Sequence, residues 1–330
     1  MLQSGHAYQF PFIFVVPRRL LPQICRHFKQ NVHVEHFHTM VPPTLGDHML
    51  ASNDKTLLHD MTPYTSHIDY MVRVSLLRKS CPEDRVTKTL AESIKKVRVI
   101  PIVVEEPPVS LNEMSGYCTR KVKIVKRGLL RGRQGRLTAS AAQPKPVQLS
   151  SPSCEATESV STVAVLHLRF DPEGNEQPPQ LGSLTSELAV HTFYSVAPWE
   201  DLVRPSGLVS FSVSGRGLYT ENVPLSTMCV ASAQWMKHSD TVRRVSVRST
   251  MSEELTTAGR GTYYTASVVI AITLPKTRAF VPTFQSCLMA RIYSLELSLS
   301  YQPAGKTFLT PTVSLSVPIQ ITSHAATPDR

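Results

Sequence analysis

The chain has 330 residues and a mass of 36.6 kDa, enough for two ordinary domains, because a single hydrophobic core rarely grows beyond about 250 residues. Apolar residues make up 42% of the sequence, which excludes a fully disordered chain, and no run reaches the roughly 18 apolar residues of a membrane-spanning helix. The formal net charge of +10 favours anionic partners, and any contact with a membrane is expected to be peripheral.

Strand patterns dominate the chain. Runs at residues 68–77, 295–301 and 313–321 alternate apolar and polar side chains, and successive side chains of a strand point to opposite sides, so each run indicates a sheet covered on one face. In chain order, strands are predicted at residues 10–16, 32–38, 68–77, 97–104, 122–125, 137–139, 163–170, 184–194, 208–213, 227–235, 263–274, 295–301 and 313–321. One short helix, or else a loop, is expected at residues 83–96. The number and spacing of the strands predict an all-β protein built from antiparallel, immunoglobulin-like β-sandwiches.

A domain boundary is predicted at Glu105-Glu106-Pro107-Pro108, where acidic residues and paired prolines end a strand. The first domain is then residues 1–107 and the second residues 108–330. Two polar segments, at about 139–157 and 239–261, are expected to be mobile loops of the second domain.

Cysteine usage and the N-terminal residues predict a cytoplasmic protein. Six cysteines are spread along the chain with no Cys-x-x-Cys pair, as is typical of reduced thiols. The apolar run at residues 10–16 is interrupted by Pro11 and is followed, not preceded, by the basic pair Arg18 and Arg19, which is the wrong order for a secretory signal.

A basic segment at residues 118–136 contains no acidic residue and is a candidate site for phosphate, on anionic lipid headgroups or on nucleic acid. It also contains no Phe, Tyr or Trp that would stack on bases, which argues against nucleic acid. The alternative is an exposed strand and loop with a solvated face. The candidate binding residues are Arg120, Lys121, Lys123, Lys126, Arg127, Arg131 and Arg133, with Arg136 at the end of the segment.

Neither a metal site nor an active site is predicted. The densest group of possible ligands is His27, His33, Glu35, His36 and His38, but on a strand these side chains would divide between two faces, so we interpret them as edge histidines in water. The chain has no G-x-S-x-G, P-loop or G-x-G-x-x-G motif. We therefore expect a protein that is not an enzyme and has no catalytic residue, cofactor or metal.

The proline pairs Pro42-Pro43 and Pro107-Pro108 are candidate contacts for a proline-binding groove of a partner. A groove of the WW type also needs a tyrosine two residues after the pair, where this chain has Leu45 and Ser110. Termination of strands is therefore the favoured role of these prolines.

Several longer phrases of the sequence resemble the fungal arrestin-like family, the arrestin-related trafficking adaptors. The first set, which is similar to the second half of an arrestin-like N-terminal lobe, consists of residues 8–17 (YQFPFIFVVP), 20–22 (LLP) with Cys25, 42–47 (PPTLGD), 68–77 and 105–108. The second set, which is similar to the C-terminal lobe, consists of residues 170–172 (FDP), 178–182 (PPQLG), 281–287 (VPTFQSC) and 294–301 (SLELSLSY). The resemblance implies two arrestin-like antiparallel β-sandwich lobes, with the first strands of the N-terminal lobe missing.

The same resemblance implies a non-catalytic adaptor that links plasma-membrane transporters or receptors to a HECT-type ubiquitin ligase for ubiquitin-dependent endocytosis. Such a protein would be cytoplasmic and peripheral at the plasma membrane or endosomes. Family members often recruit the ligase through Pro-Pro-x-Tyr, which this chain lacks, so the ligase is a partner by resemblance alone. The alternatives are a basic β-sandwich module that binds phosphoinositide or nucleic acid, a truncated non-functional paralogue, and an enzyme whose motif is not recognisable.

Overall fold

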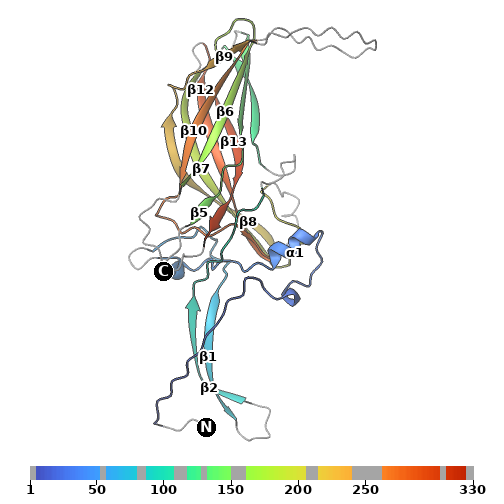
Figure 1. The fold of residues 1–330 in the computed structure, drawn as a ribbon, viewed down its shortest axis with the longest axis vertical. Helices are drawn as coiled ribbons and strands as arrows, with labels where there is room; N and C mark the ends of the chain where they lie inside the picture. Colours follow the sequence, from blue (N-terminus) through green and yellow to red (C-terminus); the bar gives the residue numbers. More distant parts are fainter. Residues whose placement is uncertain are drawn as a thin grey trace, which may run out of the picture.

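The computed structural model describes residues 5–52, 57–79, 87–107, 117–127, 132–149, 161–205, 215–239, 262–304 and 310–324. Antiparallel strands predominate among them, which confirms the all-β prediction. Figure 1 shows an elongated β-sandwich from whose lower end a two-stranded ribbon projects. No helix in the described part of the chain is long and apolar enough to cross a membrane.

The sandwich consists of two main sheets. The first has the strand order β3-β4-β6-β10-β9, with bounds β3 (Arg120–Lys126), β4 (Arg133–Ala141), β6 (Ser161–Pro172), β10 (Thr262–Thr273) and β9 (Met236–Ser239). The second has the order β11-β12-β7-β8, with β13 also paired to β12, and bounds β11 (Phe284–Gln285), β12 (Met289–Gln302), β7 (Gln180–Ser195), β8 (Arg216–Cys229) and β13 (Thr312–Ile319). A short parallel pair, β5 (Val147–Leu149) and β14 (Ile321–Ser323), lies near the lower end of the sandwich in Figure 1.

Alternating side chains of the two sheets meet in one large hydrophobic core. On β12 the residues Leu295, Leu297 and Leu299 are buried, while Glu296 and Ser298 between them face outward and are partly exposed. The same alternation buries every second residue of β10 and most of the inward side of β13. Burial of each such side chain stabilises the fold by about 1.5–3 kcal/mol, and this accounts for the pairing of the two sheets.

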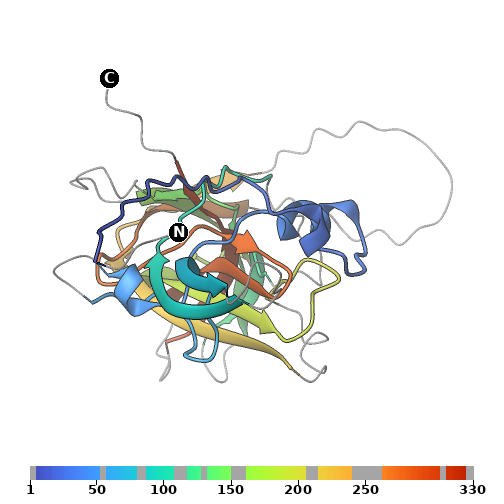
Figure 2. The ribbon, with the colours of Figure 1, turned by 90° about the horizontal axis from the view of Figure 1, so that it is seen from below.

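The described residues before 107 are arranged differently. They contain η1 (Pro22–Ile24), α1 (Val32–His38), α2 (His48–Ala51) and the ribbon, in which β1 (Tyr70–Lys79) pairs with β2 (Thr87–Val97). Figure 2, viewed from the ribbon end, shows the ribbon curling in front of the sandwich, with α1 to one side. In this part of the described chain the strands are those of the ribbon, so an N-terminal sandwich lobe stays a prediction.

The base of the ribbon is fastened by specific polar contacts. Leu45 and Ile68 exchange two backbone hydrogen bonds of 3.1 and 2.8 Å. Lys96 bridges the carboxylates of Asp47, at 2.7 Å, and Asp69, at 3.3 Å. The base is therefore fixed, although much of the ribbon beyond it is exposed.

A buried arginine joins the N-terminal region to the sandwich. Arg291 on β12 is fully buried, and its guanidinium donates to the carbonyls of Asp60 at 2.9 Å and Met61 at 3.1 Å, and to the hydroxyl of Thr62 at 2.7 Å. Met61 has a φ of 58°, in the left-handed region that residues other than glycine seldom adopt. Because Arg291 binds the carbonyls on both sides of this turn, it stabilises the strained conformation.

Two predicted elements of the N-terminal region are wrong in type. Residues 32–38 form the helix α1 and not a strand: the Asn31 side chain caps the helix by accepting from the Val34 amide at 3.2 Å, and Val34 and His38, four residues apart, form its buried face. Of residues 83–96, expected as helix or loop, residues 87–96 belong to β2, because pairing with β1 along its whole length outweighs local helix preference, and residues 83–86 lie outside the described part of the chain.

Other predicted boundaries shift. Residues 10–16 are exposed and are not assigned to a strand. Of residues 97–104, Val97 ends β2 and the rest is irregular apart from a bridge at Val103; β8 ends at Cys229, so residues 230–235 are not strand. The expected loop at 139–157 overlaps β4 and β5, and the segments 208–213, 150–157 and 240–261 lie outside the described residues.

Candidate functional site

The basic segment forms the edge of the first sheet. Arg120 and Lys126 lie on the outer face of β3 with the exposed apolar residues Val122 and Ile124, because side chains alternate along a strand. The register places Arg136 of β4 and Arg169 of β6 on the same face. Arg169 pairs with Asp171 on this face, at 2.9 Å, so the cationic character of the outer face comes mainly from Arg120, Lys126 and Arg136.

The remaining cations of the segment do not join that face. Lys121 and Lys123 are exposed, but they share the inner side of β3 with the buried Val125. Arg127 is partly neutralised by Glu176, whose Oε2 lies 3.0 Å from its Nε. Arg133 is exposed, and Arg131 lies outside the described residues. Lysines on an edge strand also oppose pairing with a further strand, so their exposure has a structural explanation beside the phosphate-binding one.

The predicted proline contacts divide between buried and exposed positions. Pro43 is buried, and the carbonyl of half-buried Pro42 accepts a 2.7 Å hydrogen bond from the Tyr70 hydroxyl at the base of the ribbon. Pro107 is exposed, and Pro108 lies outside the described residues. In this conformation Pro43 packs inside the protein, whereas Pro107 is accessible to a partner.

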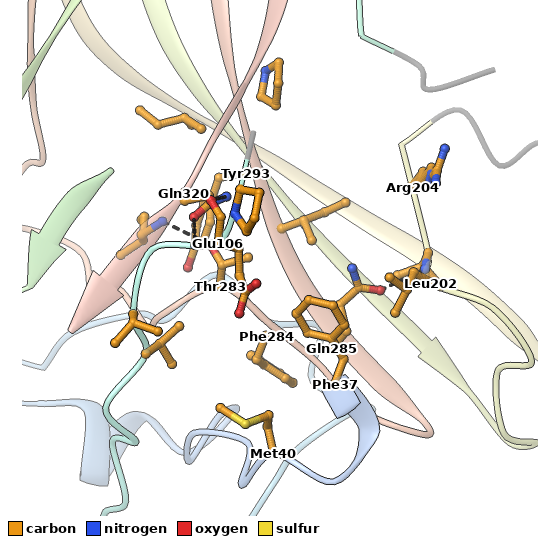
Figure 3. A pocket seen from close by; sticks show the side chains of 18 of the residues that line it. Phe37, Met40, Glu106, Leu202, Arg204, Thr283, Phe284, Gln285, Tyr293 and Gln320 are labelled. Carbon is orange, nitrogen blue, oxygen red and sulfur yellow. Dashed lines mark hydrogen bonds between the residues drawn. The ribbon is translucent and has the colours of Figure 1, made fainter. Parts of the chain in front are cut away.

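A pocket of about 270 Å³ lies where the N-terminal region meets the lower end of the sandwich (Figure 3). Its walls are mostly apolar and come from α1 and the turn after it, the segment before residue 107, the 202–204 loop and the ends of β11, β12 and β13. The main apolar lining residues are Phe37, Met40, Val41, Val203, Phe284 and Ile292.

A few polar groups border this pocket. The Gln320 side chain pairs with the backbone of Glu106 through two hydrogen bonds of 3.0 Å, which holds the 103–107 segment against the sandwich. Burial raises the pKa of Tyr117 to about 12, so its hydroxyl stays neutral at physiological pH. Glu106 and Arg204 contribute one charge of each sign to the lining. The pocket is suited to an uncharged apolar group, such as one side chain of a protein partner.

The ribbon exposes more apolar side chains than is usual for a hairpin that is surrounded by water. On one face, Val72, Val74 and Leu76 of β1 follow one another at alternate positions, opposite Lys95, Ser93 and Ala91 of β2. Val74 is 56% exposed and Leu76 43% exposed. Exposed apolar surface of this kind is typical of interaction sites.

The histidines between residues 27 and 38 are arranged differently from the prediction. Because α1 is a helix, His38 points inward and is buried, so the interpretation of these residues as edge histidines in water is wrong for His38. His36 instead contacts Arg19, with its Nδ1 2.9 Å from the arginine Nη2, and His33 is exposed.

His27 and His38 come together with two cysteines that sequence reasoning missed, Cys25 and Cys287. The Cys25-x-His27 spacing was the available local signal. The fourth member, Cys287, is 262 positions from Cys25 and has no local signal of its own.

A scan against protein-family models and a search of curated proteins find no match. The assignment of sites therefore depends on the residues and contacts of this chain.

Proposed function

We propose that the chain is a non-catalytic adaptor that holds two macromolecules together. The observation that carries this proposal is the projecting β1–β2 ribbon, an apolar surface on a different element from the cationic outer face of the first sheet. An adaptor needs two surfaces that bind independently, because it acts by raising the effective concentration of one partner near the other.

The ribbon is suited to a protein partner. Among the described residues its two strands form a separate sheet, so each strand has an edge to which a further strand can add. A two-stranded hairpin alone is marginally stable in water, and a partner that covers Val74 and Leu76 would supply the missing apolar contact. We assign this surface to the protein partner of the adaptor.

The resemblance to fungal arrestin-like adaptors supplies the identity of the two partners in this proposal. The cargo is a plasma-membrane transporter or receptor, and the second partner is a HECT-type ubiquitin ligase that marks the cargo for endocytosis. Since the chain has no Pro-Pro-x-Tyr sequence, the ligase contact is assigned to a folded surface, for which the ribbon is the candidate.

Co-precipitation of the whole chain with a purified HECT-type ligase tests this assignment. Val74→Glu with Leu76→Glu places charge on the ribbon face that carries Val72, Val74 and Leu76, and we expect it to weaken capture at least about tenfold. Ser75→Glu, on the opposite face of the same strand, is the matched control and should capture the ligase as the unchanged chain does. Failure of the unchanged chain to capture any HECT-type ligase, or equal capture by both variants, would contradict the proposal.

A second candidate function, binding of anionic lipid, is favoured by the cationic outer face of the first sheet. A flat membrane contacts one face of a sheet at a time, and each Lys or Arg near the surface contributes about 1 kcal/mol. Arg120→Glu with Lys126→Glu should therefore abolish flotation with phosphatidylserine and phosphoinositide vesicles, whereas Lys121→Glu with Lys123→Glu, on the other side of β3, should retain more than half of it. Absence of flotation by the unchanged chain would reject this candidate.

A further inference from the structure

Four side chains from distant parts of the chain meet where the N-terminal region lies against the sandwich. Cys25 and His27 follow η1, His38 ends α1, and Cys287 lies in the turn between β11 and β12. One ligand atom of each residue lies within 4.8 Å of those of the other three. Cys25 and His38 are each 2% exposed, and His27 and Cys287 are half-buried, so the cluster is enclosed but can be reached from solvent.

Three of the six separations between the four ligand atoms match the edges of a metal-centred tetrahedron, and the other three are within 4.8 Å. Zinc bonds of about 2.3 Å to sulfur and about 2.0–2.1 Å to nitrogen place two sulfurs about 3.8 Å apart, two nitrogens about 3.3 Å apart, and a sulfur and a nitrogen about 3.5 Å apart. Here the sulfurs of Cys25 and Cys287 are 3.6 Å apart, and Nε2 of His27 lies 3.3 Å from Nδ1 of His38 and 3.2 Å from Sγ of Cys25.

Contacts around the cluster orient two of the ligands. Nδ1 of His27 lies 2.8 Å from the carbonyl oxygen of Phe28 and donates to it, which leaves the lone pair of Nε2 facing the other three ligands. The turn that carries Cys287 is fixed because the Trp199 amide donates to the Cys287 carbonyl at 2.8 Å, and the Ser286 hydroxyl donates to the Met289 carbonyl at 2.7 Å.

The helix that carries His38 is also held in place. The Gln30 backbone amide donates to the carbonyl of Glu200 at 2.9 Å, and the side-chain Nδ2 of Asn31, the N-cap residue of α1, donates to the Asp201 carboxylate at 3.2 Å. Both His38 and Cys287 are thus presented by backbone that is fixed by contacts outside the cluster. A metal site needs this kind of pre-organised support.

The donor set itself selects the metal. Two thiolates and two neutral imidazoles in tetrahedral arrangement are the ligands that zinc prefers, and together they give a complex with no net charge. All four positions are filled by the protein, as in structural zinc sites, whereas a catalytic zinc keeps one position for water or substrate.

We propose that Cys25, His27, His38 and Cys287 bind one zinc ion in a structural Cys₂His₂ site. The site fastens the N-terminal region, through the end of α1 and the turn after η1, to the β11–β12 turn of the sandwich. Because three ligands lie within the N-terminal region and one lies on the sandwich, zinc cross-links these two parts of the chain.

Metal analysis of the purified whole chain, after dialysis against metal-free buffer, should give about one zinc per chain. Replacement of zinc by Co²⁺ should give the d–d bands of tetrahedral cobalt with a thiolate-to-cobalt charge-transfer band, a signature of both ligand type and geometry. This measurement uses the unchanged chain, so it does not depend on whether a variant folds.

Variants then assign the ligands. Cys287→Ser removes a ligand and should weaken zinc binding by more than about 100-fold, which is the largest loss expected when only a residue that contacts a ligand is changed. Cys287→His keeps a ligand and should still bind cobalt, with a weaker charge-transfer band. The matched controls are Cys229→Ser and His33→Gln, at an exposed cysteine and an exposed histidine outside the cluster, and both should bind zinc as the unchanged chain does.

Three results would overturn the proposal: a dialysed chain with all thiols reduced and no bound zinc, a cobalt spectrum without the thiolate band, or a disulfide between Cys25 and Cys287 in the protein purified with zinc present. Equal zinc content in the Cys287→Ser and Cys229→Ser variants would also overturn it.

Discussion

The sandwich and the N-terminal region are held together by different kinds of interaction. In the sandwich, alternating side chains of two sheets fill one continuous core, which Met61 of the N-terminal region also joins. The N-terminal region is attached by particular polar contacts, above all the Arg291 guanidinium and the Cys/His cluster, and by a small apolar cluster in which Leu45 packs against Val281 and Phe284. Its ribbon is largely exposed. A substitution in the first region should therefore affect the whole fold, whereas one in the second should detach a part.

The largest effect is expected at the centre of the sandwich. Phe170 is fully buried in the main core, and Phe170→Ala should lower the free energy of unfolding by about 3–5 kcal/mol, because it removes apolar contacts and leaves a cavity. Leu76→Ala on the ribbon, a site 43% exposed, should change it by less than about 0.5 kcal/mol. Urea unfolding followed by tryptophan fluorescence measures both, and equal effects would contradict the distinction between the regions.

The attachment of the N-terminal region should depend on Arg291. Arg291→Met leaves buried carbonyls of Asp60 and Met61 without the guanidinium, and we expect a loss of about 2–4 kcal/mol. Arg291→Lys keeps the charge but has one nitrogen to donate, so the stability of this variant should lie between those of Arg291→Met and the unchanged chain. Limited proteolysis should cut the Met variant first near residues 57–62; first cleavage within the sandwich would show that Arg291 has a different role.

Acid should weaken the sandwich through His191. Burial, with a further contribution from the Arg291 charge, lowers the pKa of His191 to about 4 from 6.5. Above pH 6.5 the imidazole is neutral in both states, but between pH 6.5 and about 4 the unfolded chain takes up a proton that the folded chain does not. The free energy of unfolding should therefore decrease as the pH is lowered from 6.5 to about 4, by up to about 3 kcal/mol.

His191→Gln keeps a hydrogen-bonding side chain beside Thr220 and Ser294 but cannot titrate, so it should remove this part of the pH dependence. His33→Gln, on the exposed side of α1, is the control. Urea unfolding at several pH values gives the slope, and an unchanged slope in the His191 variant would show that other groups cause it.

A smaller destabilisation is expected at the base of the ribbon. The Asp47 carboxylate caps α2 by accepting from the amides of Met49 and Leu50 at 3.0 and 3.2 Å, and it also pairs with Lys96. Asp47→Ala should lower the free energy of unfolding by about 1 kcal/mol, the usual effect of losing an N-cap. Asp47→Asn keeps the cap but not the charge, so it should retain most of the stability that Asp47→Ala loses. If it does not, the ion pair with Lys96 contributes more than the cap.

Sequence patterns predicted the sandwich better than the N-terminal region, for a physical reason. Where a strand has one buried face, period-two alternation is visible, as at residues 263–274 and 295–301. In α1, Val32 and Val34 at alternate positions gave the pattern of a strand, although the side chains that the helix buries are Val34 and His38. In β2, Leu90, Ile94 and Val97 have the spacing of a helix, although Leu90 lies in a bulge opposite Leu76 and Leu77.

Candidate sites were predictable where their residues lie close together in the sequence, and were missed where they do not. The basic segment was predictable because its cations are contiguous, yet which of them share a face depended on the register of β3 with β4. The pocket is lined by several segments that no local pattern connects. The Cys/His cluster combines a short segment with Cys287, and only tertiary structure brings that residue near.

Hydrogen exchange on the whole chain, with zinc and after zinc is removed by a chelator, tests most directly whether the N-terminal region is fastened separately from the sandwich core. We expect chelation to accelerate exchange in α1 and in the turn that contains Cys25, while the central strands β7 and β12 keep their protection. Loss of protection in all of these elements together, or no change in any of them, would contradict this account.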